Sequence, residues 1–300
     1  MIRTPDTSWI DVSTVKHLRF PFSFFLLPVF LFALSQAVQV EWQHALLSGF
    51  ILHLLIFPSS NGYNSYQDRD TGSIGGLKYP PPVTEKLFYI TLAFDGAAIL
   101  LSLLLSGSFA LLVLIFIVVS RLYSYRKVRL KKYPLTAFLT VFFFQGAFVY
   151  FIAVSSFSEP FRENLLSLPH LQGMIISSLF IGSMYPLTQI YQHQSDKDDG
   201  VVSLSYRLGY NGTFVFSGML FATGTLLLSL ILIQSGQIPM LFLFLFLLFP
   251  AILHLSRWFI LVRKDCAEAN YEQTMKCNLL ASLAMNLFFS FLIIHNHFLA

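Results

Sequence analysis

Residues 212–256 read GTFVFSGMLFATGTLLLSLILIQSGQIPMLFLFLFLLFPAILHLS, and no Asp, Glu, Lys or Arg interrupts them. A helix needs about 20 mostly apolar residues to cross the hydrocarbon core of a bilayer. The turn Ser235-Gly236-Gln237 divides the stretch into two segments, 212–234 and 238–256, each close to that length. The stretch therefore predicts two membrane-spanning helices joined by a tight turn.

The whole chain shares this apolar character. Among its 300 residues, 55% are hydrophobic, 33 are Phe, and only 11% are charged, where a soluble globular chain carries about 25%. So few charges could not cover the surface of a soluble protein, and a disordered chain would be poor in apolar residues. The composition therefore predicts an all-α, polytopic membrane protein.

Apolar runs separated by polar links give nine candidate spans. We predict one bundle of nine transmembrane helices, a single domain over 20–300, after a polar N-terminal segment 1–19 without the pattern of a cleavable signal peptide. The predicted spans are 20–38, 43–60, 87–106, 108–122, 135–155, 172–190, 212–234, 238–256 and 274–298.

The basic residues indicate how these helices are oriented. Consecutive spans cross in opposite directions, so the N-terminus and the links after the second, fourth, sixth and eighth spans share one side. Of the 19 Lys and Arg, all but Arg162 fall on that side. Because cytoplasmic loops carry an excess of Lys and Arg, we expect this side to be cytoplasmic and the C-terminus to lie on the opposite side.

The link after the second span carries a first group of oxygen-bearing side chains. It reads NGYNSYQDRDTG over residues 61–72, with Lys78 shortly before three prolines. If the helix continues past Pro58, Asn64 and Asp68 lie one turn apart on one face, and Asp70 follows closely. Such oxygens suit a hard divalent cation. The alternative is a polar cap where the helix leaves the bilayer.

A second acidic group follows the sixth span. Residues 191–200 read YQHQSDKDDG and run into SLSYRLG at 203–209. Asp196 and Asp199 are three residues apart, on one face of any helix formed there. With Asp198 they repel one another unless a cation lies among them. The alternative is a solvated acidic turn.

Between these links lies the basic segment RLYSYRKVRLKK, residues 121–132. The orientation of the helices alone could account for its six cations. Beside two acidic groups, however, they indicate an anionic ligand such as a diphosphate. Mg²⁺ typically joins carboxylates to phosphate oxygens, and Lys and Arg bind the remaining oxygens.

The two acidic links, placed after the second and sixth spans, resemble the UbiA superfamily of intramembrane prenyltransferases. Asn64 and Asp68 match the first Asn and the central Asp of the family's Asn-Asp-x-x-Asp-x-x-x-Asp motif. Ser65 and Gly72 replace its other two acids, and Asp70 could supply a carboxylate from a shifted position.

The second motif and the basic segment extend this resemblance. The family pattern Asp-x-x-x-Asp-x-x-x-Gly-x-x-Thr-Leu, ending in Arg-Leu-Gly, is matched at Asp196, Gly200 and residues 207–209, with Gln192 in place of the first acid and Ser203-Leu204 in place of Thr-Leu. Tyr123-Ser124 followed by Arg129-Leu-Lys131 is similar to the family's Tyr-Ser-x-Pro-Pro-x-Lys-x-Lys segment without its prolines, and Lys78 before Pro80 is similar to its basic residue before a proline.

The resemblance implies an enzyme that uses Mg²⁺ to transfer a prenyl group from a prenyl diphosphate to an aromatic or other electron-rich lipophilic acceptor in the membrane. It implies membrane lipid as the surroundings and no nucleic-acid partner. It implies Asp68 and Asp196 as catalytic residues. The implied metal ligands are Asn64, Asp68, Asp70, Asp196 and Asp199, and the implied diphosphate-binding residues are Asn64, Asp70, Lys78, Arg126, Lys131 and Gln192.

Two further questions stay open in the sequence. Asp95 interrupts the third span, where an ionisable group marks a functional site or forms a hydrogen-bonded helix contact beside Gly96. A transporter is an alternative to an enzyme. Transporters tend to show internal repeats and polar groups at mid-membrane, whereas this sequence shows no clear internal repeat and carries nearly all its ionisable residues in the predicted links on one side. A relative that has lost catalysis is the other alternative, given Ser65, Gly72 and Gln192.

Overall fold

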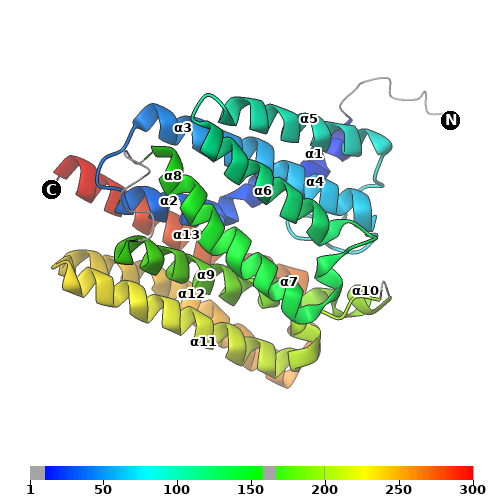
Figure 1. Ribbon diagram of the computed structural model, residues 1–300. Coiled ribbons are helices and arrows are strands. Elements are labelled where there is room, and N and C mark those ends of the chain that lie inside the picture. Colours follow the sequence, from blue (N-terminus) through cyan, green and yellow to red (C-terminus); the bar gives the residue numbers. More distant parts are fainter. Residues whose placement is uncertain (1–10, 158–166, 199, 300) are drawn as a thin grey trace. The chain divides into compact units, whose positions relative to one another are not determined.

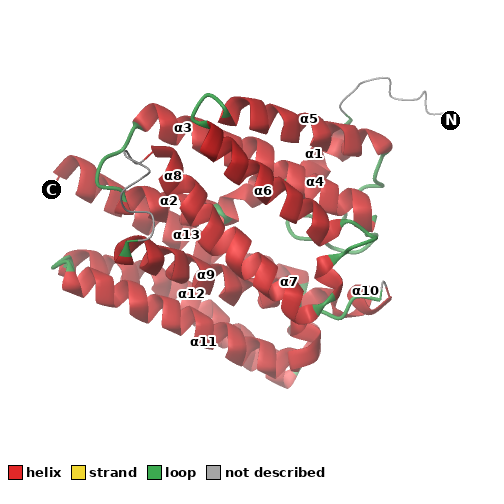
Figure 2. Cartoon of the chain, in the orientation of Figure 1, coloured by secondary structure: helices red, strands yellow, loops and turns green. Residues whose placement is uncertain are grey.

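The computed structural model describes residues 11–157, 167–198 and 200–299. Its regular elements in these ranges are helices (Figure 2), and the one β-bridge, between Ile74 and Leu77, is isolated. The predicted all-α class is confirmed. Asp199 and Arg162 lie outside the described residues.

The chain packs into two compact units. The first unit comprises Met1–Ser23 and Phe50–Arg129, and the second comprises Phe24–Gly49 and Leu130–Ala300. The N-terminal part of each unit is therefore separated in sequence from the rest of it. The single domain predicted over 20–300 stays a prediction.

Helix α4 is the centre of the first unit. It packs against α1, α5 and α6 (Figure 1). Gly62 on α4 allows this close packing, because a Cβ there would come within 2.9 to 3.1 Å of side-chain atoms of Thr91, Leu18 and Leu87. The helices of this unit are α1 (Val12–Leu18), the π-helical η2 (Ile51–Ile56), α4 (Phe57–Asp68), α5 (Glu85–Ser102) and α6 (Gly107–Ser124).

The second predicted span runs past Pro58 to Asp68, further than the predicted end at residue 60. Pro58 follows the π-helical turn η2 within one continuous helix, Trp42–Asp68, and the nearby carbonyl oxygen of His53 accepts a hydrogen bond from Ser23 Oγ instead of from the backbone. The π-helical turn η2 precedes it without breaking the helix. The helix ends where Arg69 takes a left-handed conformation. Asn64 and Asp68 therefore lie on one helical face.

The second unit holds the remaining helices, except the 3-10 helix η1 (Phe20–Phe25), whose residues are divided between the two units. Helix α11 packs along α9, α12 along α13, and α13 against α2 (Figure 1). The elements are α2 (Leu27–Gln36), α3 (Trp42–Phe50), η3 (Leu130–Lys132), α7 (Pro134–Val141), the π-helical η4 (Phe142–Phe148), α8 (Val149–Phe157), α9 (Leu168–Thr188), η5 (Ile190–Gln192), α10 (His193–Asp198), α11 (Leu204–Gln234), α12 (Ile238–Lys264), η6 (Cys266–Glu268), α13 (Tyr271–Ile294) and η7 (His295–Leu299).

A glycine brings α9 into backbone contact with η4. A Cβ on Gly146 would lie 2.4 Å from the Cα of Ser178, so only glycine permits this approach. Ser178 Oγ accepts a hydrogen bond from the N–H of Ala147 at 3.0 Å. The serine thereby binds an N–H within the π-helical turn, where side-chain insertion is a usual cause of such irregularity.

Seven helical stretches are long and apolar enough to cross a membrane, and the bent pair Val12–Phe25 and Leu27–Gln36 is an eighth candidate. Helix α5 is not among them, because it carries Glu85, Lys86 and Asp95 within 18 residues. The chain is an integral membrane protein, but nine spans are not confirmed. The seven stretches are Trp42–Asp68, Gly107–Ser124, Pro134–Phe157, Leu168–Gln192, Leu204–Gln234, Ile238–Lys264 and Tyr271–Leu299.

Candidate functional site

The first acidic motif occupies the last two turns of α4 in the first unit. The Asp68 side chain is buried, and one of its carboxylate oxygens forms an ion pair with Arg129 Nη2 at 3.4 Å. Arg129 is itself buried and takes a left-handed conformation (φ 47°) just after the end of α6. The partner of Asp68 therefore comes from the basic segment that follows α6.

Asn64 is oriented by the same part of the chain. Ser124, the last residue of α6, donates a hydrogen bond from Oγ to Asn64 Oδ1 at 2.8 Å. This bond fixes which way the amide of Asn64 points. The end of α6 thus holds both oxygen-bearing residues of the motif, Asn64 directly and Asp68 through the segment that follows.

Arg126 binds the C-terminal end of α4. Its Nε donates to the carbonyl oxygen of Gln67 at 2.5 Å, and its Nη2 donates to the carbonyl oxygen of Asp68 at 3.1 Å. The last carbonyls of a helix lack partners within the helix and favour a cation. Arg126 therefore stabilises the turn of α4 that carries Asp68, and its predicted contact with a diphosphate stays a prediction.

Asp70 and Lys78 lie in the connection from α4 to α5. Asp70 is partly buried just beyond the end of α4, whereas Lys78 is exposed, with its Nζ 5.4 Å from the centre of the Tyr79 ring. Ser73 Oγ donates to the carbonyl oxygen of Lys78 at 2.9 Å and closes this turn. The loop thus keeps a cation close in sequence to the acidic motif.

Asp95, on α5, belongs to a buried network that reaches α4 at Ser59 and Tyr63, on the N-terminal side of the motif. Arg121 Nε donates to Asp95 Oδ2 at 2.9 Å, and Ser59 Oγ donates to Asp95 Oδ1 at 2.6 Å. The guanidinium of Arg121 lies 4.0 Å from the centre of the Tyr63 ring and also contacts Thr91. The structure favours the interpretation of Asp95 as a hydrogen-bonded helix contact, and it joins α4, α5 and α6.

In the second unit, the Arg207-Leu208-Gly209 sequence forms a kink inside α11. Gly209 has φ 65° and ψ 175°, a conformation essentially restricted to glycine. Thr213 Oγ1 donates to the carbonyl oxygens of Gly209 at 2.7 Å and Ser205 at 3.1 Å, which bridges the kink. Ser203 caps the start of α11 by accepting a hydrogen bond from the N–H of Tyr206. The second motif is therefore a capped and kinked helix start.

His193 connects the acidic turn to this helix start. Its Nε2 lies 2.8 Å from Ser205 Oγ, and its ring stacks on Tyr210 with 5.0 Å between ring centres. Burial lowers the pKa of His193 below its usual value. His193 begins α10, which carries Asp196, and Gln192 lies immediately before it in η5. Asp199 lies outside the described residues, and Lys131 lies in η3 of this unit.

Four residues that the sequence did not single out as site residues hold the motifs in place. Ser124, Arg129 and Arg121 belong to the basic segment, where the excess of cations concealed their individual roles. His193 stood among polar residues of the second acidic link. Their partners lie 12 to 61 residues away in the chain, so spacing alone gave no signal.

The donor atoms of the first motif fit Mg²⁺. An amide oxygen and a carboxylate lie one helical turn apart on α4 and are oriented by Ser124 and Arg129. Among the described residues, no group of three or more His, Cys, Asp or Glu could hold a metal ion alone. Mg²⁺ is usually held by one or two carboxylates together with substrate phosphates, so a site completed by a substrate agrees with this donor set.

The helical fold defines an integral membrane protein. At the end of its helix α4, oxygen-bearing side chains of Asn64 and Asp68 lie beside the arginines that follow α6. Residues 24–280 match the UbiA prenyltransferase family, and the chain belongs to that family. This match confirms the resemblance drawn from the motifs. A comparison with curated proteins finds no match in sequence.

Solved structures share the fold at low sequence identity. A UbiA homolog from Archaeoglobus fulgidus bound to GPP and Mg²⁺ has 16% identity and a TM-score of 0.63, with 94% of this chain and 99% of that chain covered. A UbiA homolog from Aeropyrum pernix K1 has 17% identity and a TM-score of 0.61, covering 91% and 97%. A digeranylgeranylglyceryl phosphate synthase has 16% identity and a TM-score of 0.59, covering 95% and 97%.

Proposed function

We propose that this protein transfers a prenyl group from a prenyl diphosphate to an electron-rich, lipophilic acceptor within the membrane, with Mg²⁺ as its metal. One observation carries the proposal: in a chain of the UbiA family, α4 continues to Asp68 and presents Asn64 and Asp68 on one face, each oriented by a second side chain. The Archaeoglobus fulgidus homologs bound to GPP or DMAPP together with Mg²⁺ support the donor and the metal.

The reaction transfers one carbon group. The bond between the allylic carbon and the diphosphate oxygen breaks, and the diphosphate leaves with the electron pair. The acceptor supplies an electron pair for the new bond, and the proton that this bond displaces is released. Asn64, Asp68 and the other acidic residues would hold Mg²⁺, which would supply positive charge to stabilise the leaving diphosphate.

The residues of this chain hold the donor headgroup and keep water away. Asn64, Asp68 and Asp70 supply oxygen atoms from the first unit, and Gln192, Asp196 and Asp199 supply them from the second motif. Lys78, Arg126 and Lys131 bind diphosphate oxygens as cations. The apolar helices around the site exclude water, which would otherwise capture the allylic cation.

The proposal is tested by the release of diphosphate from geranyl diphosphate by purified protein, with and without Mg²⁺. We expect activity only with Mg²⁺, and a loss of at least about 100-fold in Asp68→Asn and in Asp196→Asn, since each substitution removes a charged ligand. Asp265→Asn is the matched control, because among the described residues that carboxylate caps the short helix η6 by accepting a hydrogen bond from the N–H of Ala267.

Two outcomes would contradict the proposal. Normal turnover in both Asp variants would show that these acids hold no metal needed for the reaction. A protein that binds no geranyl diphosphate in calorimetry with Mg²⁺ present would not be a prenyltransferase, and transport or a scaffold role would then be favoured.

We further propose that the N-terminus and the acidic links are cytoplasmic and that the C-terminus lies on the opposite side of the membrane. The distribution of basic residues supports this orientation.

A further inference from the structure

The loop between α4 and α5, residues 69–84, begins next to Asp68 and carries the exposed Lys78. Ile74 and Leu77 exchange main-chain hydrogen bonds of 2.9 and 2.8 Å, which close a turn at its centre. The loop also contains Gly72, Gly75 and Gly76 before Lys78, and prolines at residues 80–82 after it. Because glycine leaves the chain many conformations, bonds within the loop do not decide where Lys78 lies relative to α4.

Residues 11–22, here named the N-terminal strap, bind this loop within the first unit, and Arg19 joins it to α4. Arg19 Nη1 donates to the carbonyl oxygen of Gly75 at 3.0 Å, and Nη2 donates to that of Asn61 at 2.9 Å. Arg19 is buried and takes a left-handed conformation (φ 49°) at the end of α1. Asn61 lies on α4, one turn before Asn64. One planar guanidinium therefore links the turn that leads into the acidic motif to the loop.

The ring of Phe22 packs on the same part of the loop. A Cβ on Gly75 would lie 2.9 Å from atoms of this ring, and a Cβ on Gly76 would lie 3.1 Å from them. The guanidinium of Arg19 lies 5.6 Å from the centre of the same ring. The N-terminal strap therefore holds the loop just before Lys78, at two residues that lack a side chain.

Helix α1 of the strap holds the loop on the other side of Lys78. Ser13 Oγ donates to the carbonyl oxygen of Pro82 at 2.6 Å, and Nε2 of the buried His17 lies 2.8 Å from the carbonyl oxygen of Pro81. Because a carbonyl oxygen only accepts, His17 Nε2 carries the hydrogen of this bond. Lys78 therefore lies between two parts of the loop that the N-terminal strap binds.

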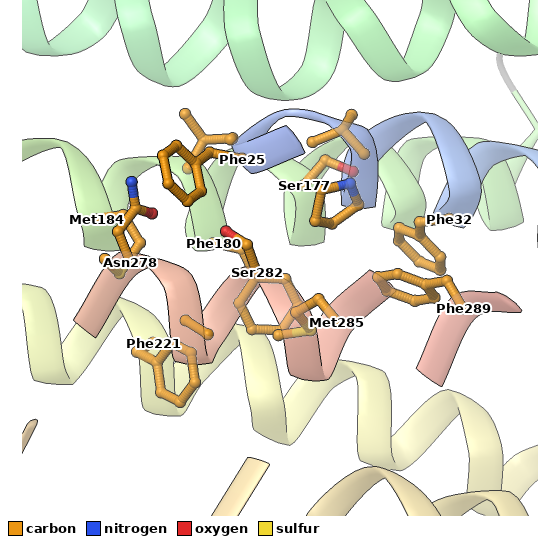
Figure 3. Close-up of a pocket in the computed structure, with 14 residues that line it drawn as sticks. Phe25, Phe32, Ser177, Phe180, Met184, Phe221, Asn278, Ser282, Met285 and Phe289 are labelled. Atoms are coloured by element: carbon orange, nitrogen blue, oxygen red, sulfur yellow. The ribbon is translucent and has the colours of Figure 1, made fainter. Parts of the chain in front are cut away.

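These contacts differ in kind from those of the next helix in the chain. In the second unit, α2 packs on α13 through apolar rings, and Phe32 and Phe289 stack with 4.7 Å between ring centres (Figure 3). Burial of apolar surface is not directional, whereas a hydrogen bond to a carbonyl oxygen restricts both distance and angle. The contacts of the N-terminal strap are therefore suited to fixing the backbone of the loop.

We propose that the N-terminal strap is a positioning element for the prenyl donor, because it orders the loop so that Lys78 is in place before the diphosphate binds. This inference rests on the proposed function, in which Lys78 binds diphosphate oxygens. A loop that is already ordered loses less conformational entropy when the donor binds, so the donor binds more tightly. Ser13, His17 and Arg19 act through the loop as positioning residues.

Two variants release the loop. Arg19→Lys keeps the charge and loses the planar group that donates to two carbonyls, and Ser13→Ala with His17→Phe removes two hydrogen bonds and keeps an aromatic ring. We expect each variant to raise KM for geranyl diphosphate about 3- to 10-fold and to change kcat less than about 2-fold, since ordering affects ground state and transition state alike. Hydrogen exchange over residues 70–84 should become at least about 3-fold faster.

Lys16→Met is the matched control, because Lys16 is an exposed cation on the same helix; KM and hydrogen exchange should stay as in the parent. Combination with Lys78→Met separates positioning from a merely structural role. In the Lys78→Met protein, Arg19→Lys should raise KM no further, because two changes that act through one group are not additive. An equal effect of Arg19→Lys with and without Lys78 would show that the strap does not act through Lys78, and the inference would be wrong.

Calorimetry with inorganic diphosphate and Mg²⁺ separates this inference from the proposed function. If the released variants bind inorganic diphosphate more weakly than the parent and no protein consumes geranyl diphosphate, the proposed function fails and the inference survives. If geranyl diphosphate is turned over with an unchanged KM in both released variants, the inference is wrong and the proposed function stands. If the parent binds neither diphosphate, both are wrong.

Discussion

Asp95 and Arg121 form a salt bridge whose side chains are 12% and 17% exposed. Removing one partner of such a pair leaves a buried charge without compensation, which costs about 3–5 kcal/mol, whereas replacing both partners by apolar side chains can be nearly neutral. We therefore expect Asp95→Asn to destabilise the protein strongly, and Asp95→Leu with Arg121→Met to recover most of the loss. The free energy of unfolding, measured by SDS titration of the purified protein, checks this.

An exposed ion pair in the same unit is the control for that comparison. Arg69 Nη2 lies 2.7 Å from Glu85 Oε1, with both side chains more than half exposed. Arg69→Met should change the free energy of unfolding little, because exposed pairs are screened by water and salt. If the Asp95→Asn protein had the same free energy of unfolding as the Arg69→Met protein, the buried salt bridge of Asp95 with Arg121 would not stabilise the fold.

Gly209 is a residue whose backbone conformation decides the local structure, the kink near the start of α11. Its φ of 65° and ψ of 175° are strained for any residue with a Cβ, at a cost of about 1–3 kcal/mol. Gly209→Ala should therefore lower the free energy of unfolding by that amount. Gly218→Ala on the same helix is the control: apart from the backbone of its own helix and its chain neighbours, no atom of the described residues lies within 4 Å of a Cβ there, so alanine should be neutral or stabilising by up to about 1 kcal/mol. If both substitutions changed the free energy of unfolding equally, the left-handed backbone conformation of Gly209 would not be needed for stability.

At the scale of elements, the end of α6 positions the motif on α4 through Ser124 and Asn64. Ser124→Ala removes the donor to Asn64 Oδ1, and one such hydrogen bond is worth about 1 kcal/mol. We expect kcat/KM for geranyl diphosphate to fall about 5-fold and the Mg²⁺ concentration for half-maximal activity to rise. Ser124→Thr keeps the hydroxyl and should restore both values.

A serine of the neighbouring helix controls for the loss of a hydroxyl. Ser102 Oγ donates to the carbonyl oxygen of Ala98 within α5 at 2.6 Å, so Ser102→Ala should leave both kinetic values unchanged. The proposed role of Ser124 would be refuted by an Ser124→Ala enzyme with the kinetics of the parent, or by Ser124→Thr behaving like Ser124→Ala.

The sequence predicts these elements better than it predicts their ends and partners. Hydropathy is a property of one segment, so each predicted apolar run corresponds to helix in the structure. The start of α11 at Leu204, rather than at residue 212, depends on the Ser203 cap and on Thr213 bridging the Gly209 kink. Those hydrogen bonds are specific contacts that hydropathy does not report.

The candidate site shows the same limit more sharply. The spacing of Asn64 and Asp68 could be predicted because it depends on one helix continuing past Pro58. The ion pair of Asp68 with Arg129 could not, because it depends on how α6 ends beside α4 and on the left-handed conformation of Arg129. Residue types therefore identify the oxygen atoms that could bind a metal ion, and tertiary packing decides which of them are oriented by a neighbouring side chain.

At the scale of the whole molecule, the orientation in the membrane can be tested with the two natural cysteines. Cys266 is exposed in η6 and Cys277 is buried in α13. Because η6 lies in the link after α12, which the distribution of basic residues predicts to be cytoplasmic, a membrane-impermeant maleimide should label Cys266 in inverted vesicles. Right-side-out vesicles should stay unlabelled until detergent opens them.

Cysteines introduced at single positions complete this test in a Cys266→Ser background. Ser106 and Ser235 lie in the turns before α6 and before α12, on the side predicted to be extracytoplasmic, so cysteines there should be labelled in right-side-out vesicles. Lys127 lies in the basic segment and should follow Cys266. Because alternate crossings link all these positions, reversed labelling of the whole set would invert the orientation. Labelling of Cys266 and residue 235 from the same side would show that α12 does not cross the membrane.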